Sequence, residues 1–167
     1  MVERTPESFL DLGSGGGLPG LVLALAWPSC RAVLLDASSR RTEFLQEAGE
    51  RLGISARVTV VCERAEIAAR TATLRGKFDL VTARSFASPA VTAECGAPFL
   101  GEGAVMVVSE PPEDVERWPA DGLAQVSLEL AVPASPSTRY VVLRRTAAVD
   151  ERWPRRTGIP AKRPLWR

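Results

Sequence analysis

The first residues with clear chemical potential form a glycine-rich run, DLGSGGGLPG, from Asp11 to Gly20. Glycines let a backbone turn sharply and approach a ligand closely, because no Cβ atom stands in the way. The run satisfies the G-x-G-x-x-G pattern from Gly15 onward, in which a pyrophosphate rests on a helix N-terminus. It also has Asp11 two residues before Gly13, where a carboxylate repels a pyrophosphate and can hold an ammonium group. The second pattern favours the methionine part of S-adenosylmethionine, while NAD and a loop without a ligand remain alternatives.

Asp36 closes a second apolar run, RAVLLD, over residues 31–36. A carboxylate at the end of such a strand can accept hydrogen bonds from both hydroxyls of a ribose. Asp36 would serve NAD and S-adenosylmethionine equally, so it predicts an adenosine site without choosing the cofactor. The alternative is a local role, in which Asp36 caps the next helix beside Ser38.

The residue inventory excludes several kinds of chemistry. The chain has no histidine, which removes Ser-His-Asp and Cys-His triads and histidine metal sites. Cys30, Cys62 and Cys95 are an odd number without a CxxC pair, so we expect buried thiols, no disulfide framework and no metal site. The longest apolar run, residues 21–27, is too short to cross a bilayer, and the first residues lack a signal-peptide pattern. These features predict a cytoplasmic protein without a membrane partner.

Short apolar runs alternate with helical patterns along most of the chain. We expect strands at 8–12, 31–36, 57–62, 78–83 and 104–109, and helices at 18–27, 38–52, 66–73 and 88–94. In the second helix the expected apolar stripe is Phe44, Leu45, Ala48 and Leu52. Two further strands, 125–132 and 139–144, are joined by a link too short for a helical crossover, so they should be antiparallel. The predicted fold is therefore α/β, with a mostly parallel seven-stranded sheet, a terminal antiparallel hairpin and helices on both faces. The hairpin resembles the Rossmann-like class I methyltransferase version of this sheet, whose ligands bind at the carboxyl ends of the strands.

Charge is distributed unevenly over the 167 residues. The net charge is +1, yet residues 139–167 contain nine basic and two acidic side chains. We predict a cofactor-binding domain over residues 1–146 and a basic tail rich in Pro, Arg and Trp over 147–167. Basic residues interleaved with tryptophans are typical of a strip that meets RNA phosphates and bases. The candidate RNA contacts are Arg155, Arg156, Lys162 and Arg163. The alternative is a tail that packs back on the sheet with its tryptophans buried.

The glycine run and several later motifs resemble the small-subunit (16S) rRNA guanine-N7 methyltransferases, also called glucose-inhibited division protein B. The similarity extends over nearly the whole chain from Phe9 onward. The motifs that carry it are DLGSGGGLPG (11–20), LLDASSRRTEFL (34–45), RAE (64–66), FDLVTARSFA (78–87), RYVVLRR (139–145) and RRTGIPAKRPL (155–165). The LPG extension and the C-terminal motif are the specific ones.

This resemblance implies S-adenosylmethionine as cofactor and 16S rRNA, or the small ribosomal subunit, as partner. It also implies cofactor contacts at Gly13, Leu18, Ala65, Glu66 and Arg84. Guanine N7 carries a lone pair and no proton, so its methylation needs no general base, and we expect no catalytic side chain. Phe86 is a candidate platform for stacking the target base, although core packing is the other interpretation.

Two features depart from the family's usual pattern. Its members usually carry a helical segment before the first strand, whereas about seven residues precede it here. They also often have Lys-Gly after the fifth strand, where this chain has Ser109-Glu110. An acid near the substrate should weaken a phosphate contact. A degenerate cofactor-binding module that binds RNA or regulates, without activity, is therefore the second hypothesis, and an NAD-dependent oxidoreductase is the third.

Overall fold

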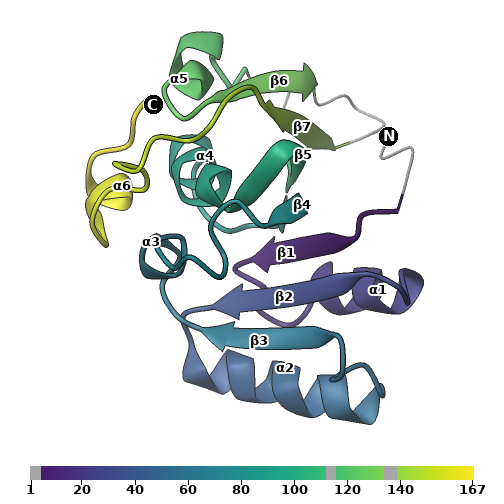
Figure 1. Ribbon diagram of the computed structural model, residues 1–167. Helices are drawn as coiled ribbons and strands as arrows, with labels where there is room; N and C mark the ends of the chain where they lie inside the picture. Colours follow the sequence, from purple (N-terminus) through teal and green to yellow (C-terminus); the bar gives the residue numbers. More distant parts are fainter. Residues whose placement is uncertain (1–4, 112–115, 134–138) are drawn as a thin grey trace.

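The computed structural model describes residues 5–111, 116–133 and 139–167. Its centre is one seven-stranded sheet in the order β3-β2-β1-β4-β5-β7-β6 (Figure 1). The five strands from β3 to β5 are parallel, and β7 runs antiparallel to both of its neighbours. The predicted fold, including the terminal antiparallel hairpin, is confirmed. The strands are β1 (Ser8–Leu12), β2 (Arg31–Asp36), β3 (Val58–Cys62), β4 (Phe78–Ala83), β5 (Leu100–Ser109), β6 (Leu128–Val132) and β7 (Tyr140–Arg145).

Helices cover both faces of the sheet. They are α1 (Gly20–Ala26), α2 (Ser39–Arg51), α3 (Ala65–Ala68), α4 (Pro89–Gly96), the 3₁₀ turn η1 (Ala97–Phe99), α5 (Ala120–Ala124) and α6 (Ile159–Lys162). Side chains alternate across β1, because successive residues of a strand point to opposite faces. Phe9 belongs to the core cluster under α1 and α2, whereas Leu10 and Leu12 belong to the cluster under α3, α4 and α5. All of β1 is buried, as expected for a central parallel strand.

Several predicted boundaries were wrong. Helix α1 begins at Gly20, and Pro19 is its N-cap residue rather than part of its first turn. The residues before the helix belong to the glycine-rich loop. Gly20 lies so close to Asp11 that a Cβ atom on Gly20 would be 2.6 Å from Oδ2 of Asp11. The strand expected at 125–132 begins only at residue 128, because residues 125–127 form the turn that follows a short, unpredicted helix, α5. Helix α3 ends at Ala68, well short of residue 73.

The apolar stripe of α2 is narrower than expected. Leu45 is fully buried, whereas Phe44 and Leu52 are exposed. Ser38 is the N-cap residue, but its side chain makes no capping hydrogen bond. Among the cysteines, Cys30 and Cys95 are buried as expected, and Cys62 is exposed.

Residues 147–167, called here the C-terminal segment, pack back on the body of the protein. The segment passes α4, forms α6 and ends near α5 (Figure 1). Trp153 is 7% exposed and belongs to the same core cluster as Leu10. The Trp166 indole donates a hydrogen bond to the Arg117 carbonyl (3.1 Å). The tail therefore packs back on the protein, as the alternative interpretation of the sequence proposed, with Trp153 buried and Trp166 partly buried.

Candidate functional site

A cleft of about 340 Å³ opens at the carboxyl ends of the parallel strands. This is the edge at which ligands bind in open α/β sheets. Its walls come from the loops after β1, β2, β3 and β4, from helix α4 and from the C-terminal segment. The lining residues are Leu12, Gly13, Leu35, Asp36, Ala37, Arg41, Glu63, Arg64, Ala65, Glu66, Ser85, Phe86, Ala87, Val91, Cys95 and Ala161. Four predicted cofactor residues, Gly13, Asp36, Ala65 and Glu66, are thus brought together.

Gly13 lines the cleft where the chain leaves β1. Its φ of +71° lies in the left-handed region of backbone conformation, which residues other than glycine rarely adopt. A Cβ atom on Gly13 would lie 2.6 Å from Cδ2 of Phe86. The glycine therefore lets Phe86 close over the loop, and Phe86 both lines the cleft and packs against the core cluster.

Asp11 lies beneath the glycine loop and is 1% exposed. Its Oδ1 accepts a hydrogen bond from the Thr82 hydroxyl (2.7 Å), and its Oδ2 accepts one from the Gly20 amide (3.1 Å). Burial raises the pKa of Asp11, and the hydrogen bonds from Thr82 and Ser14 counteract part of that rise. Both oxygens bind groups of the protein, so Asp11 fixes the loop between β1 and α1 and is not part of the cleft wall.

Asp36 organises the other side of the loop. Its Oδ2 accepts a hydrogen bond from the Gly15 amide, and its Oδ1 accepts one from the Ser38 amide, both at 2.9 Å. Arg41 adds an ion pair at 3.5 Å. Asp36 thus binds the amide of the N-cap residue of α2, which is a local contact but not the helix cap that was the alternative prediction. Each carboxylate oxygen can accept two hydrogen bonds, so the contacts leave acceptor capacity toward the cleft.

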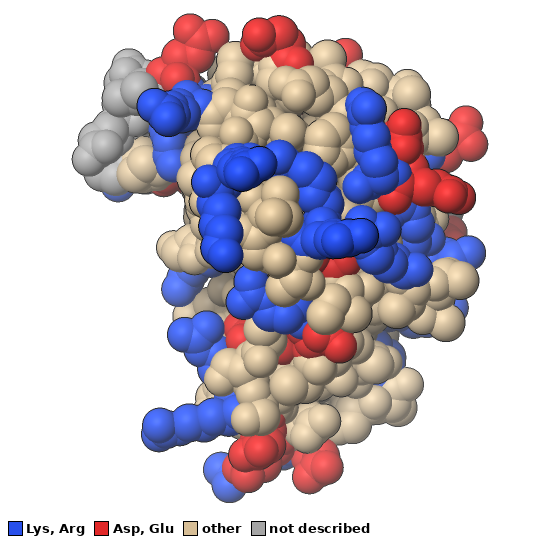
Figure 2. Space-filling view, turned by 90° about the vertical axis from the view of Figure 1, so that its left-hand side faces the viewer, with Lys and Arg blue, Asp and Glu red and all other residues tan. Residues whose placement is uncertain are grey.

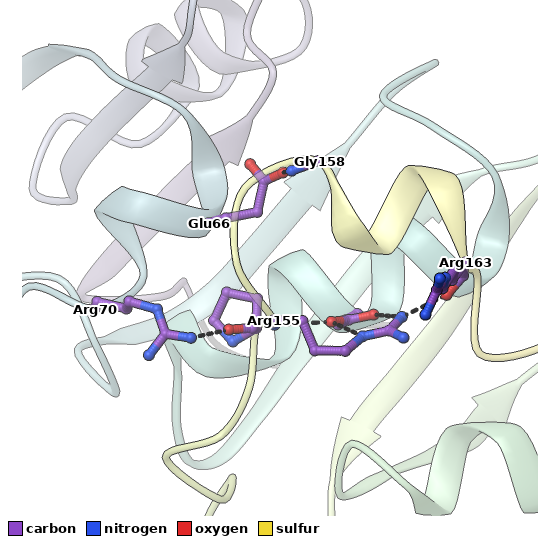
Figure 3. Close-up of polar contacts among 7 residues, drawn as sticks. Glu66, Arg70, Arg155, Gly158 and Arg163 are labelled. Atoms are coloured by element: carbon purple, nitrogen blue, oxygen red, sulfur yellow. Dashed lines mark hydrogen bonds and ion pairs between the residues drawn. The ribbon is translucent and has the colours of Figure 1, made fainter.

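Glu66 joins the cleft to the C-terminal segment. Its Oε1 accepts a hydrogen bond from the Gly158 amide (2.9 Å) and lies 3.5 Å from Nη2 of Arg64. The other carboxylate oxygen points away from the segment (Figure 3). Burial alone would raise the pKa of Glu66, but the hydrogen bond from Gly158, with further ones from its own amide and Arg64, lowers it below the ordinary 4.5. Glu66 is therefore held as a carboxylate at the cleft wall.

Besides Asp11, three more predicted cofactor residues lie outside the lining of this cleft. Leu18 is 49% exposed on the loop, and Arg84 is exposed just after β4. Gly15 borders a separate hollow formed with Ser38, Arg40 and Phe44. Arg84 still acts electrostatically on Asp11, since its charge lowers the pKa of that carboxyl.

The four candidate RNA contacts have different surroundings. Arg155 is bound inside the protein, because its guanidinium pairs with both oxygens of Glu94 (2.8 and 2.6 Å). Arg156, Lys162 and Arg163 are exposed. Figure 2 faces the carboxyl edge of the sheet and shows Lys and Arg side chains gathered across its middle. The structure thus separates Arg155, which holds the fold, from three basic residues on the surface.

The acid that departs from the family pattern, Glu110, is paired. Its side chain is 6% exposed and its Oε2 lies 3.1 Å from Nη1 of Arg117. A carboxylate that is buried and neutralised in this way does not present a free negative charge to RNA. Glu110 is therefore not placed to oppose a phosphate contact, contrary to the expectation from sequence.

The comparisons with known proteins agree on one family. Residues 1–118 match the family model described as rRNA small subunit methyltransferase G. The Ribosomal RNA small subunit methyltransferase G of Prochlorococcus marinus (strain MIT 9313) is 37% identical over 172 residues, which cover 97% of this chain and 69% of the relative. That of Rubrobacter xylanophilus is 38% identical over 175 residues, covering 97% and 66%. The chain belongs to this family. It spans about two thirds of the length of these curated relatives.

Solved structures support the fold of this family member. The antibiotic-resistance methyltransferase Kmr superposes with a TM-score of 0.67 at 13% identity, covering 84% of this chain and 87% of that one. An O-methyltransferase family protein from Burkholderia thailandensis gives a TM-score of 0.65 at 12% identity, covering 86% and 52%. Both structures resemble this chain in having the class I methyltransferase fold. Over the described residues, no group of His, Cys, Asp and Glu is arranged to hold a metal ion, and no helix could span a membrane.

Sequence reasoning missed two parts of the site. Ala161 lines the cleft, although neither interpretation of the tail placed it at the cofactor site. Glu94, which is 0% exposed, holds the segment that carries Ala161. The available signal was an isolated acid in the apolar run PAVTAECGAPFL (89–100), which predicts a buried charge that needs a partner.

Proposed function

We propose that this protein transfers a methyl group from S-adenosylmethionine to N7 of a guanine in 16S rRNA. The proposal rests on one observation: in a member of this methyltransferase family, Gly13, Asp36, Ala65 and Glu66 surround a single cleft at the carboxyl edge of the sheet. The family's described action on small-subunit rRNA supplies the substrate class.

The cleft suits an adenosine-containing cofactor. Its volume falls within the range of about 300–1,000 Å³ that is typical of ligand pockets. Leu35, Phe86 and Val91 give it an apolar lining for a flat ring. Asp36 has acceptor capacity for ribose hydroxyls, and Glu66 adds an acceptor for an exocyclic amine. From the family resemblance we add Leu18, Gly15 and Arg84 as contacts made outside this cleft.

The chain's residues orient the reactants and do not transfer protons. S-adenosylmethionine would supply a methyl group on a positively charged sulfur. The lone pair of guanine N7 would form the new N–CH₃ bond as the S–CH₃ bond breaks, leaving neutral S-adenosylhomocysteine and the positive charge on the methylated base. No general base is needed, which is consistent with a chain that contains no histidine. The work of the protein is alignment of the nucleophile with the methyl group and exclusion of water. Phe86 is suited to this work, because it closes over Gly13 at the cleft.

RNA contacts are proposed at the exposed basic residues of the same edge. Arg156, Lys162 and Arg163 flank or belong to α6, and Arg84 follows β4. Lys162 follows Ala161, and Arg84 precedes Ser85, both of which line the cleft. Arg155 is left out of the proposed contacts, since its guanidinium pairs with Glu94.

Two measurements test the proposal. Calorimetry should detect S-adenosylhomocysteine binding and no NAD binding, and the reverse would refute the cofactor assignment. Labelled S-adenosylmethionine is then offered to unmethylated 16S rRNA and to intact small subunits, and the modified base is mapped. Label on guanine N7 supports the proposal. Cofactor binding without transfer to either substrate would instead support the degenerate, non-catalytic module.

A further inference from the structure

Hydrogen bonds in both directions attach the C-terminal segment to the body of the protein: the segment donates some and accepts others. Two acids of the body accept hydrogen bonds from it, Glu66 from Gly158 and Glu94 from Arg155. Two arginines of the body donate to its carbonyls. Arg70 donates to Pro154, and Arg75 donates to Trp153 (2.8 Å), Val149 (3.0 Å) and Asp150 (3.0 Å). Figure 3 shows the contacts of Arg155, Gly158 and Arg70 along one stretch of the segment.

The strongest of these contacts is the Arg155–Glu94 pair. The Glu94 carboxylate is fully buried and accepts hydrogen bonds from the Arg155 amide (2.9 Å), Nε (2.8 Å) and Nη2 (2.6 Å). Nη2 also donates to the Arg163 carbonyl at 2.7 Å, beyond α6. Arg155 therefore fixes both ends of the turn that contains Gly158 and Ala161. A bidentate, charge-assisted pair gives this fixation its geometric precision.

The other end of this arrangement reaches the cleft. Gly158 holds one carboxylate oxygen of Glu66, and Ala161 is part of the cleft wall. If the segment departs, Glu66 loses the hydrogen bond that orients it and the cleft loses one side. We infer that the C-terminal segment is a wall of the cofactor site, and that Arg155 is a positioning residue that couples the docking of this segment to cofactor binding.

This inference rests on the proposed function, because it takes the cleft to be the cofactor site. It makes a quantitative statement. Coupling free energy is reciprocal, so the factor by which segment docking tightens cofactor binding equals the factor by which cofactor binding tightens segment docking. A residue with only a structural role would give a factor of one, so its replacement would lower stability and leave cofactor affinity unchanged.

The test uses two readouts on the full chain. Calorimetry compares S-adenosylhomocysteine binding by Arg155→Gln, Arg155→Lys and Arg152→Gln. Arg152 is the matched control, since its guanidinium also lies over the Trp153 ring but pairs with Asp150 of its own segment. We expect Arg155→Gln to weaken binding by about fivefold or more, within the range of typical couplings, with partial recovery in Arg155→Lys and no change in Arg152→Gln.

The second readout needs no variant. Limited trypsin digestion of the wild-type protein follows cleavage after Lys162, with cleavage after Arg51 at the end of α2 as internal reference. Saturating S-adenosylhomocysteine should slow the Lys162 cut, by about the factor measured for affinity, and leave the Arg51 cut unchanged. Cofactor binding without such protection, or equal affinity in Arg155→Gln and Arg152→Gln, would overturn the inference alone. Absence of binding to the wild-type protein would overturn the proposed function and the inference with it.

Discussion

The buried charge pair of Glu94 and Arg155 is the side-chain contact whose loss should lower the free energy of unfolding most. Arg155→Gln leaves a fully buried carboxylate without its cation, and losses of this kind cost about 3–5 kcal/mol. The double variant Glu94→Gln/Arg155→Gln should lose clearly less than the sum of the two single losses, because it removes both charges. Urea unfolding of the four proteins measures the coupling. Additive losses would show that the two side chains act independently.

Glu66 predicts a pH-dependent stability. Its pKa is lower in the folded protein than the ordinary 4.5, so the folded state gains from the charged form. This stabilisation is complete above pH 4.5 and is lost as the pH falls through the lower, folded-state pKa. Glu66→Gln keeps an acceptor for Gly158 but has no charge. The wild-type protein should therefore melt at a higher temperature than this variant at pH 6–7, and the two melting temperatures should converge toward pH 3. A difference that does not change with pH would contradict this.

Among single residues, those that lie near the ends of strands could be assigned to the site from the sequence. Which side chains pair with one another was harder to predict. Gly13 follows β1, Asp36 ends β2, and Glu66 lies in the short helix α3 just beyond β3. They meet because parallel strands end at one edge of the sheet. The pairing of Glu94 with Arg155 could not be foreseen, since 61 residues separate them and their contact depends on how the C-terminal segment packs.

The glycine loop is the element whose shape the cofactor site requires most directly. Gly13→Ala would force a side chain into the left-handed region, at a cost of about 1–2 kcal/mol, and would displace Phe86. We expect S-adenosylhomocysteine binding to weaken at least tenfold. Gly16→Ala is the matched control, since a Cβ atom there meets nothing within 4 Å. Calorimetry on the two variants decides: equal affinities would mean that the Gly13 backbone does not shape the site.

At the element scale, strands were predicted more accurately than helices. Strands β1, β2 and β4 follow from short apolar runs with clear ends, because buried parallel strands are apolar on both faces. The start of α1 and the existence of α5 were missed, because short helices depend on their tertiary contacts more than on their intrinsic propensity. Phe44 was assigned to the core by its helical spacing, but the stripe that contacts the sheet is narrower.

The uneven charge of the whole molecule predicts how RNA binding depends on salt. Replacing Arg156, Lys162 and Arg163 by Gln should reduce the slope of log affinity against log salt by about 2, at roughly 0.7–0.9 per phosphate contact. The matched control replaces Arg31, Arg51 and Lys77, which are exposed near the amino ends of the strands. It removes the same charge from the opposite edge and should leave the slope nearly unchanged. Equal slopes for the two triple variants would refute the proposed RNA face.

The division into residues 1–146 and 147–167 can be tested by deletion. Trp153 is part of the core cluster, and Glu94 depends on Arg155, so removal of the C-terminal segment should uncover apolar surface and leave a buried acid unpaired. We expect a lower melting temperature and a lower free energy of unfolding for residues 1–146 than for the full chain. Equal stability would show that the body is an independent domain. Composition suggested a separate tail, since charge and proline content cannot report how a few tryptophans pack.

The packing of Trp153 gives the molecule an optical reporter of its own. The indole is buried, and the guanidinium carbons of Arg152 and Arg155 lie 4.9 and 5.7 Å from its ring centroid. Its fluorescence in this dry, cation-rich setting must differ from that in water. Trp27 and Trp118 belong to the body, whereas Trp166 belongs to the same segment and reports together with Trp153. Intrinsic emission can thus report, without any dye, whether this end of the chain is packed on the protein.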